Sequence, residues 1–566
     1  MSPTPSRPPE TTESTSATRF PGGRGADDRR LRLRSRVMAA TGGVLAAAVA
    51  LASGEFVGEV LVDAPSPVYA VAGVFVDESP GGLVSWSIDT FGGTQQTILV
   101  WGIVLASLCL GGLLGLVALR SRPAAFGGFV AFGVVGWWAG GRDLLATSQG
   151  AFFSSAVAAA SGIAVMDVLD RFRRAMLGRS GASTTIGAEA GPPPPPAPDE
   201  SSAAPLGGNV SGADDARRRF LAVGAGAAAW AAVAPTVGRW LGPSDPEVSS
   251  DLLAELPLSE SPAVPDGSTL DQVEGLASYI TPNDDFYLID TALRAPVVEP
   301  DDWTLQIRGM VDDELEFTFE DLAAMELEEH IITLSCVSNE VGGDLVGNAR
   351  WSGVRLDDLL ARAGVRDDAT QIVGRSVDGW TAGFPTATLD GRPALVALTM
   401  NGEPLPIEHG FPARLVVPGL YGYVSATKWL QEIELTTLEA FDAYWIQRGW
   451  AKEGPILTQS RIDVPRGGAT VAGSPTVIAG VAWAPHRGVE RVEVRVDDGD
   501  WLEARLNDEI TDNAWRQWVL RTDLAPGRHT ATVRATDETG TTQTSERSTP
   551  IPRGATGRHR VDFSVA

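Results

Sequence analysis

Five long apolar stretches constrain this chain of 566 residues more than any other feature. Each is close to the ~20 residues that a helix needs to cross the hydrocarbon layer of a bilayer. A further apolar patch around Val68–Val76 is too short to span and is expected at the interface. The sequence therefore predicts an all-α membrane region of about five transmembrane helices. The predicted spans are residues 37–54, 96–119, 124–141, 150–168 and 219–241.

The placement of arginines predicts the orientation of these spans. Five arginines lie between residues 29 and 36, whereas the loop from residue 55 to 95 carries acidic residues and no basic one. Further arginines follow the second span at 120 and 122, and the fourth at 171–179. Basic loops stay on the cytoplasmic side, so we expect a multi-pass protein of the cell membrane with a cytoplasmic N-terminus. Everything after about residue 242 is then extracytoplasmic.

The segments between the spans differ in composition. Arg217-Arg218-Arg219-Phe220-Leu221, just before the fifth span, resembles a twin-arginine export signal. A plain positive-inside anchor is the alternative interpretation. The predicted divisions of this half are a disordered cytoplasmic tail (1–36), a four-helix transmembrane region (37–180), a Pro-rich cytoplasmic linker (181–218), the fifth transmembrane helix (219–241) and a second linker (242–274).

Charge is shared unevenly along the chain. Residues 243–566 carry a net charge of −27, against +1 for the first 242 residues. Such an acidic surface repels phosphate, which argues against nucleic-acid binding. All five histidines lie after the last span, so a haem-ligating membrane anchor is not expected, and no flavin or iron–sulfur motif is present. The two cysteines, Cys109 and Cys336, lie in different parts of the chain and are not expected to pair.

The acidic half changes pattern at about residue 455. Before it, short strands alternate with short helices, which predicts an α+β domain over 275–454. Within that domain, residues 351–363 are expected to begin as a turn and to continue as an amphipathic helix. After it, regularly spaced strand-like runs predict an all-β immunoglobulin-like sandwich over 455–566. These runs are Thr476–Trp483, Arg491–Val496, Trp515–Arg521 and His529–Ala535.

Cys336 stands at the end of an apolar strand, in Thr333–Glu340 (TLSCVSNE). A lone cysteine there is ordinarily an inert core residue. Several separated motifs, however, together resemble the sulfite oxidase family of molybdopterin-dependent oxidoreductases, in a membrane-anchored bacterial or archaeal form. The motifs are Ile280–Tyr287 (ITPNDDFY), the cysteine segment, Asn401–Pro406 (NGEPLP), Glu408–Arg414 (EHGFPAR) and Lys428–Leu430 (KWL). The strands after residue 475 resemble that family's immunoglobulin-like, often dimer-forming domain.

The resemblance implies a molybdenum–pyranopterin dithiolene cofactor with Cys336 as the protein ligand to the metal and the catalytic residue. A thiolate is a soft ligand that suits a high-valent metal already bound by sulfur. Cations and hydroxyls suit the pterin phosphate. The positions that the resemblance assigns to cofactor binding are Asp284, Phe286, Tyr287, Ser376, His409, Arg414, Ser425, Thr427 and Lys428.

This sequence departs from sulfite oxidases where the substrate is expected. Those enzymes carry arginines shortly after the cysteine and after the aromatic pair, whereas here the segments read Asn339–Gly343 (NEVGG) and Leu288–Thr291 (LIDT). A dianion such as sulfite would meet Glu340 where cations are expected. Arg294 and Arg350 are the candidates to compensate. The expected reaction is two-electron oxygen-atom transfer on a small sulfur-containing or other oxo substrate, and sulfoxide reduction is the competing reading.

The sequence leaves the partners open. Electrons are expected to pass to or from an external carrier, such as a cytochrome, a quinone system or a small redox protein, and a homodimer is possible. A different class of function is a membrane-tethered, non-catalytic binding module built on the same scaffold. The presence or absence of bound molybdenum separates the two hypotheses.

Overall fold

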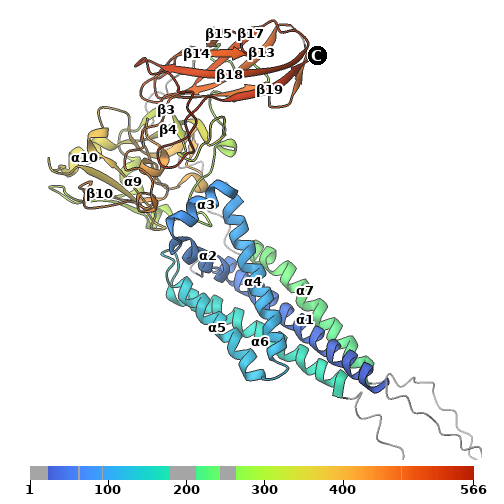
Figure 1. The fold of residues 1–566 in the computed structure, drawn as a ribbon. Coiled ribbons are helices and arrows are strands. Elements are labelled where there is room, and N and C mark those ends of the chain that lie inside the picture. Colours follow the sequence, from blue (N-terminus) through green and yellow to red (C-terminus); the bar gives the residue numbers. More distant parts are fainter. Residues whose placement is uncertain (1–22, 62–63, 92–93, 179–211, 242–262, 473) are drawn as a thin grey trace, which may run out of the picture. The chain divides into compact units, whose positions relative to one another are not determined.

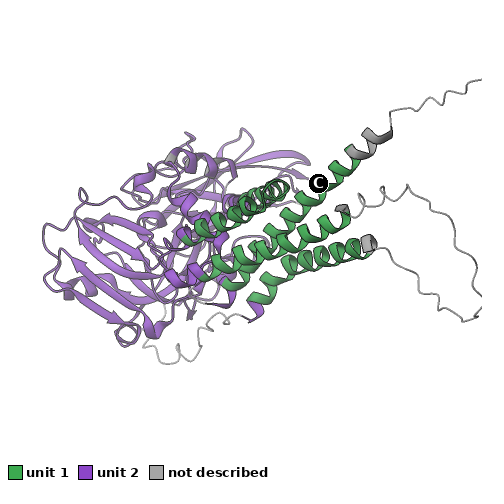
Figure 2. Cartoon of the chain, turned by 90° about the horizontal axis from the view of Figure 1, so that it is seen from below, with its two compact units in different colours: residues 1–57, 102–137, 153–238 green, residues 58–101, 138–152, 239–566 purple. Residues whose placement is uncertain are grey.

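The structure is a computed structural model that describes residues 23–61, 64–91, 94–178, 212–241, 263–472 and 474–566. The chain divides into two compact units (Figure 2). The first unit consists of residues 1–57, 102–137 and 153–238. The second consists of residues 58–101, 138–152 and 239–566 and contains the predicted cofactor site.

Five helices are long and apolar enough, by length and composition, to cross a membrane, and each overlaps one of the predicted stretches. The stretches 96–119 and 124–141 run one or two residues past the end of their helices. They are α1 (Gly23–Val60), α4 (Gln95–Val117), α5 (Arg122–Gly140), α6 (Ser148–Gly178) and α7 (Gly212–Leu241) (Figure 1).

Two of these helices begin earlier than the sequence predicted. α1 is helical from Gly23, so the prediction of disorder is wrong for residues 23–36, and α7 is helical from Gly212, inside the predicted linker. Arginine and leucine are good helix formers, so a charged segment next to an apolar helix can extend it. Residues 1–22 of the predicted tail, residues 179–180 at the end of the predicted four-helix region, residues 181–211 of the Pro-rich linker and residues 242–262 of the second linker lie outside the described residues.

Small residues hold α1 close to α4. A Cβ atom added to Gly43 would lie 2.1 Å from the carbonyl oxygen of Gly111, and one added to Gly115 would lie 2.0 Å from that of Ala39. Backbones can approach this closely only where side chains are absent or very small, as in helix pairs packed within lipid. These glycines therefore fix the crossing of the two helices.

The apolar patch expected at the membrane interface is helix α2 (Pro67–Asp77). Ser66 caps this helix by accepting a hydrogen bond from the amide of Tyr69, and Pro67 occupies the first helical position, where no amide donor is needed. A second short helix, α3 (Gly81–Phe91), follows. It was not predicted, because its glycines and polar residues break the apolar pattern.

The domain after residue 275 is built on two sheets. One has the strand order β2-β1-β10-β5-β6, and the other has the order β3-β4-β7-β8 with β9 paired to β7. The strands of the first sheet are β1 (Thr304–Gly309), β2 (Leu315–Thr318), β5 (Gln371–Ser376), β6 (Thr381–Pro385) and β10 (Leu430–Thr436). Those of the second are β3 (Glu328–Ser335), β4 (Val346–Arg355), β7 (Leu395–Met400), β8 (Glu403–Pro404) and β9 (Arg414–Val416).

Three short helices accompany these sheets: α9 (Phe319–Ala323), α10 (Leu356–Ala363) and α11 (Gly422–Ser425). The amphipathic helix predicted to end at Ala363 is α10, whose Leu356, Leu359 and Leu360 are buried as expected. The predicted turn before it is wrong, because residues 351–355 complete β4. Paired to β3 and β7 on its two sides, this segment is held in the sheet by neighbours that are distant in sequence.

The C-terminal residues form two further sheets that face each other. Their orders are β11-β13-β17-β16 and β12-β19-β18-β14-β15. Ile478 and Trp518 from one sheet and Val494 and Val533 from the other share one buried core. The strands are β11 (Gln459–Val464), β12 (Thr470–Val471), β13 (Thr476–Trp483), β14 (Val489–Val496), β15 (Trp501–Glu503), β16 (Arg505–Leu506), β17 (Arg516–Thr522), β18 (Gly527–Asp537) and β19 (Arg560–Val565).

The two-sheet C-terminal region is also joined to the preceding domain. Trp515, just before β17, belongs to the large core of that domain, and its indole nitrogen donates to the carbonyl of Tyr279 at 2.9 Å. The amide of Trp515 donates to the hydroxyl of Thr333 at 2.7 Å, and the amide of Thr333 donates to the carbonyl of Asn513 at 2.9 Å. Thr333 lies on β3, the strand that leads to Cys336.

Candidate active site

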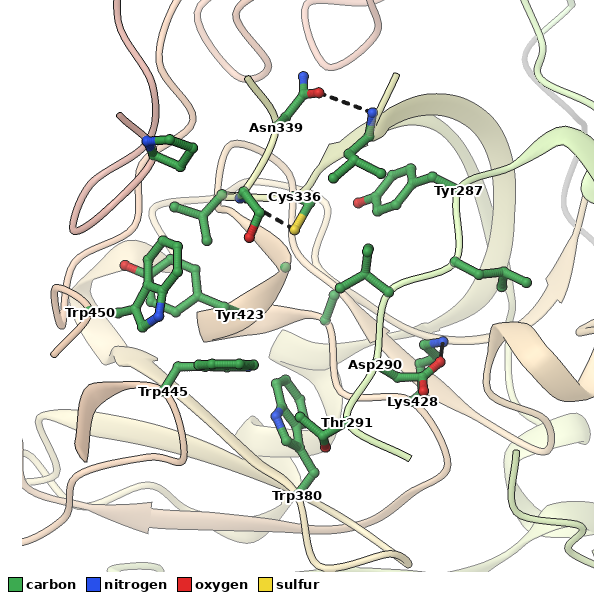
Figure 3. Close-up of a pocket in the computed structure, with 18 of the residues that line it drawn as sticks. Tyr287, Asp290, Thr291, Cys336, Asn339, Trp380, Tyr423, Lys428, Trp445 and Trp450 are labelled. Atoms are coloured by element: carbon green, nitrogen blue, oxygen red, sulfur yellow. Dashed lines mark hydrogen bonds and ion pairs between the residues drawn. The ribbon is translucent and has the colours of Figure 1, made fainter. Parts of the chain in front are cut away.

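Cys336 follows β3 and lies in a tight turn. Its amide donates to the carbonyl of Leu345 at 2.9 Å, and its carbonyl accepts from the amide of Asn339 at 3.1 Å. The amide of Leu345 donates to Oδ1 of Asn339 at 3.0 Å, which closes the loop, and the amide of Ser338 donates to the cysteine Sγ at 3.4 Å (Figure 3). Burial raises the pKa of the thiol. The turn therefore presents one buried sulfur in a fixed position, and a bound metal would hold it as thiolate.

Aromatic rings and a histidine stand beside this turn. Phe286 stacks on Tyr287 with ring centroids 5.2 Å apart and meets the edge of His409 at 5.6 Å. Loss of hydration raises the pKa of the Tyr287 phenol far above its usual range, so the phenol stays a hydrogen-bond donor. Tyr287 and His409 both line the cavity that contains Cys336.

Two buried cations line the same cavity. Arg414, at the start of β9, is 5% exposed, donates to the carbonyl of His409 at 3.0 Å and stacks on Trp351. Burial lowers its pKa to about 10. Lys428 forms an ion pair with Asp290 at 2.7 Å and also donates to the carbonyl of Glu408. Burying charge is costly unless an anion compensates it. No ion pair to Arg414 occurs among the described residues, so its charge fits an anionic group such as a pterin phosphate.

Polar atoms without partners test whether these residues fit a pterin cofactor. Buried polar groups are nearly always hydrogen-bonded. Yet in the part of the chain that the structure describes, the Nε atom of Arg414 and the hydroxyls of Ser376 and Thr427 are buried with no partner. A pterin phosphate offers several acceptors to such donors. The residues present therefore fit the cofactor that the sequence implied.

Asp284 and Ser425, two of the predicted cofactor residues, do not line the cavity. Asp284 is exposed in a single 3-10 turn (Asn283–Asp285) and does not line the cavity. Ser425 is buried at the end of α11, where its hydroxyl donates to the carbonyl of Tyr421 at 3.1 Å. The structure brings seven predicted residues together around one cavity, and Thr427 is the chain neighbour of one of them. The seven are Cys336, Phe286, Tyr287, Ser376, His409, Arg414 and Lys428.

The cavity has a volume of about 550 Å³, and much of its wall was not anticipated. Trp380, Tyr423, Trp445 and Trp450 line it, and Figure 3 shows the last three on the opposite side of Cys336 from Tyr287 and Lys428. The signal in the sequence was the aromatic density of residues 441–450, FDAYWIQRGW, directly after the last strand of the domain.

Sulfite oxidases carry arginines where the substrate is expected, and Arg294 and Arg350 were the candidates to replace them. Neither of these two side chains lines the cavity. Arg294 forms an ion pair with Glu59 and lies over the ring of Tyr69. Arg350 forms an ion pair with the buried Glu329. Both guanidinium groups therefore have carboxylate partners elsewhere, and neither lines the cavity.

The state of His409 gives a testable pH dependence. Burial, with the charges of Arg414 and Lys428, lowers its pKa to about 4, and its Nε2 lies 3.0 Å from the carbonyl of Asn283. A carbonyl only accepts, so Nε2 carries the proton and Nδ1 is left as an acceptor. The unfolded chain binds a proton near its ordinary pKa, so stability falls as the pH drops from about 6.5 towards 4.

We expect the cofactor-free protein to lose about 2 kcal/mol of unfolding free energy through His409 between about pH 7.5 and pH 5. Urea unfolding at both pH values, followed by tryptophan fluorescence, measures this loss. His409→Gln removes the titrating group and should flatten the profile by that amount. An identical pH profile for the variant and the unmodified chain would show that His409 is not held neutral.

Comparison with known proteins agrees with this geometry. Residues 292–445 match the family described as "Oxidoreductase molybdopterin binding domain". The uncharacterized oxidoreductase YuiH of Bacillus subtilis (strain 168) is 37% identical over 152 residues, which cover 27% of this chain and 74% of that protein. The fold and the site therefore define a molybdopterin-binding oxidoreductase.

Relatives that match over a longer segment of this chain indicate its family within the molybdopterin-binding oxidoreductases. Mitochondrial sulfite oxidase of Rattus norvegicus is 32% identical over 292 residues, which cover 43% of this chain and 53% of that protein. The human enzyme is 31% identical over 299 residues, which cover 44% of this chain and 54% of that protein. The crystal structure of the sulfane dehydrogenase SoxCD from Paracoccus pantotrophus aligns with a TM-score of 0.43 and 26% identity over 50% of this chain and 81% of that chain. This chain belongs to the sulfite oxidase-type family of molybdopterin oxidoreductases, and it spans about half the length of the sulfite oxidases that it matches.

Proposed function

We propose that this protein is a membrane-anchored molybdopterin-dependent oxidoreductase that transfers an oxygen atom to or from a small substrate outside the cytoplasm. The observation that supports this most is the position of Cys336. Its buried sulfur opens into a cavity whose wall also carries Arg414, Lys428 and His409. A soft ligand beside buried cations is the arrangement that an anionic metal–pterin cofactor requires.

The bound cofactor would supply two-electron oxygen-atom transfer, and the chain's own residues would hold and shield it. Cys336 would be the protein ligand to molybdenum. Arg414, Lys428 and the hydroxyls of Ser376 and Thr427 would bind the phosphate. Phe286 and Tyr287, whose rings stack on each other, would shield the cofactor from water. The neutral His409 would accept a hydrogen bond from the pterin through Nδ1.

The remaining assignments belong to the same proposal. The five apolar helices would cross the cell membrane with the N-terminus inside, and residues 275–454 and 455–566 would be the oxidoreductase domain and an immunoglobulin-like domain outside. Arg217-Arg218-Arg219 would serve export of the folded, loaded domain. Electrons would pass to or from an external carrier, and two chains could pair through the C-terminal domain.

A second candidate, sulfoxide reduction, is supported by the charge of the cavity. Arg294 and Arg350 are engaged by carboxylates elsewhere, while Glu340 and Asp344 line the cavity near Cys336. A neutral sulfoxide meets no repulsion there, whereas the sulfite dianion does.

Elemental and pterin analysis of the purified chain, expressed in a host that makes and loads the cofactor, tests the proposal. We expect a molybdenum-to-protein ratio near unity with matching pterin, and oxygen-atom transfer activity in a screen of sulfite against sulfoxides. A chain without metal or pterin would contradict the proposal and would leave a membrane-tethered binding module.

A further inference from the structure

One wall of the cavity is an ordered set of aromatic rings. Trp445 and Trp450 flank a short 3-10 turn (Ile446–Arg448), in which the amide of Trp450 donates to the carbonyl of Trp445 at 3.2 Å. Gly449 closes the turn with φ of 95°, a left-handed conformation that glycine adopts readily. The two indole rings lie 6.1 Å apart at 78°. Their placement is therefore fixed by the backbone.

Tyr423 completes this wall. Its ring lies 5.6 Å from that of Trp450, and its hydroxyl donates to the carbonyl of Ala451 at 2.6 Å. The hydroxyl is therefore already engaged, and the side chain offers the cavity mainly its ring. Trp380, which follows the turn after β5, lines the cavity next to this cluster (Figure 3). We call Trp380, Tyr423, Trp445 and Trp450 the aromatic wall.

The charges around the cavity favour a cation. Four carboxylates line it, namely Asp290, Glu340, Asp344 and Asp378. Among the described lining residues the cationic side chains are Arg414 and Lys428, and Lys428 is paired with Asp290. The cofactor phosphate would take up the charge of Arg414. The substrate would then face Glu340, Asp344 and Asp378, and among the described residues that line the cavity no cation would be left without an anionic partner.

We propose that the aromatic wall binds an organic substrate whose oxygen-transfer atom lies next to a positively charged centre, as in an amine N-oxide or an ammonium-bearing sulfoxide. This inference rests on the proposed function and names the substrate class of that same site. Aromatic faces attract cations, and the attraction grows when water is excluded. The carboxylates that line the cavity also attract a positively charged substrate, and they do so over a longer range. An inorganic oxyanion would find neither feature.

Binding of simple probes to the molybdenum-loaded full-length protein tests this inference without relying on turnover. Isothermal titration calorimetry at low ionic strength compares three probes: tetramethylammonium, tert-butanol and sulfate. The alcohol tert-butanol is close to tetramethylammonium in size and shape but carries no charge. We expect tetramethylammonium to bind at least about tenfold more tightly than tert-butanol, because only the cation gains from the ring faces. Sulfate should not compete with it.

Variants assign the effect to the wall. Trp445→Leu should weaken tetramethylammonium binding by roughly tenfold, whereas Trp445→Phe, which keeps an aromatic face, should retain most of it. Asp378→Asn should weaken it a few-fold, and less at high salt. Trp501→Phe, in the C-terminal region, is the control and should leave binding unchanged.

The molybdenum content of each sample separates the two levels of the proposal. A loaded protein that binds sulfate in preference to tetramethylammonium, or that binds neither, overturns the substrate class and leaves the proposed function standing. Equal losses in Trp445→Leu and Trp501→Phe would also overturn it, because the wall would then have no special role. A protein that cannot be loaded at all overturns the proposed function, and this inference with it.

Discussion

Replacing Cys336 by serine is expected to reduce turnover on the order of a thousandfold, equivalent to ~4 kcal/mol of lost transition-state stabilisation. A serine hydroxyl is a harder and weaker donor than a thiolate and does not match a metal bound by sulfur. The fold should tolerate the change, because the turn is held mainly by backbone bonds of Cys336 and by the Asn339 side chain. The one bond to the sulfur comes from the amide of Ser338, and a serine hydroxyl can accept it as well. Steady-state kinetics, metal content and pterin content measure the outcome.

Cys109 provides a matched control for this experiment. It is the second free cysteine, it is exposed on α4, and it does not line the cavity. Cys109→Ser should therefore keep full turnover and loading. If Cys336→Ser also kept full turnover while loaded with molybdenum, Cys336 could not be the metal ligand. If pterin were retained and turnover lost, the phosphate-binding residues and the thiolate would have separate roles, as proposed.

Replacing Arg414 by methionine is expected to move cofactor retention and protein stability in opposite directions. Removing a buried partner of the phosphate should cost about 2–5 kcal/mol of binding, so pterin content should collapse. The cofactor-free protein should be unchanged or up to about 2 kcal/mol more stable, because an isolated buried cation is replaced by an apolar side chain of similar length. Pterin analysis and urea unfolding of the cofactor-free protein measure the two effects.

For an arginine that is already paired with a carboxylate, replacement by methionine should have different effects on stability and pterin content. Arg534, on β18, forms two hydrogen bonds with Glu493, at 2.8 and 2.9 Å. Arg534→Met should lower stability by about 1 kcal/mol or less and leave pterin content unchanged. A cofactor-free Arg414→Met protein that is clearly less stable than the unmodified chain would show that the charge of Arg414 is compensated within the protein itself.

Local pattern was enough to predict much of the fold. The five long apolar helices follow from length and composition alone, and β13 has the bounds that its sequence pattern predicted. The edge strands β12, β15 and β16, of two or three residues each, were not predicted, because so short a segment carries no periodicity. Residues 351–355 were mistaken for a turn because their pairing to β3 and β7 is set by tertiary contacts.

Site residues could be predicted only where they belong to a recognisable sequence motif. Cys336, His409 and Arg414 were found through segments that resemble a known family. Trp445 and Trp450 were missed, because their shared orientation depends on a turn that sequence alone does not reveal. The sequence already shows that the arginines of sulfite oxidases are missing where the substrate is expected. Only the structure shows that Arg294 and Arg350 form ion pairs elsewhere.

The hydrogen bonds that join Thr333 to Asn513 and Trp515 have a thermodynamic consequence. The strand that leads to Cys336 is hydrogen-bonded to residues almost two hundred positions later in the chain. In addition, Val481, Trp483 and Trp515 belong to the large core of the preceding domain. Regions that share a core unfold together. We therefore expect one cooperative transition for residues 275–566, and a chain cut at the compositional boundary near 455 would lack part of its own interior.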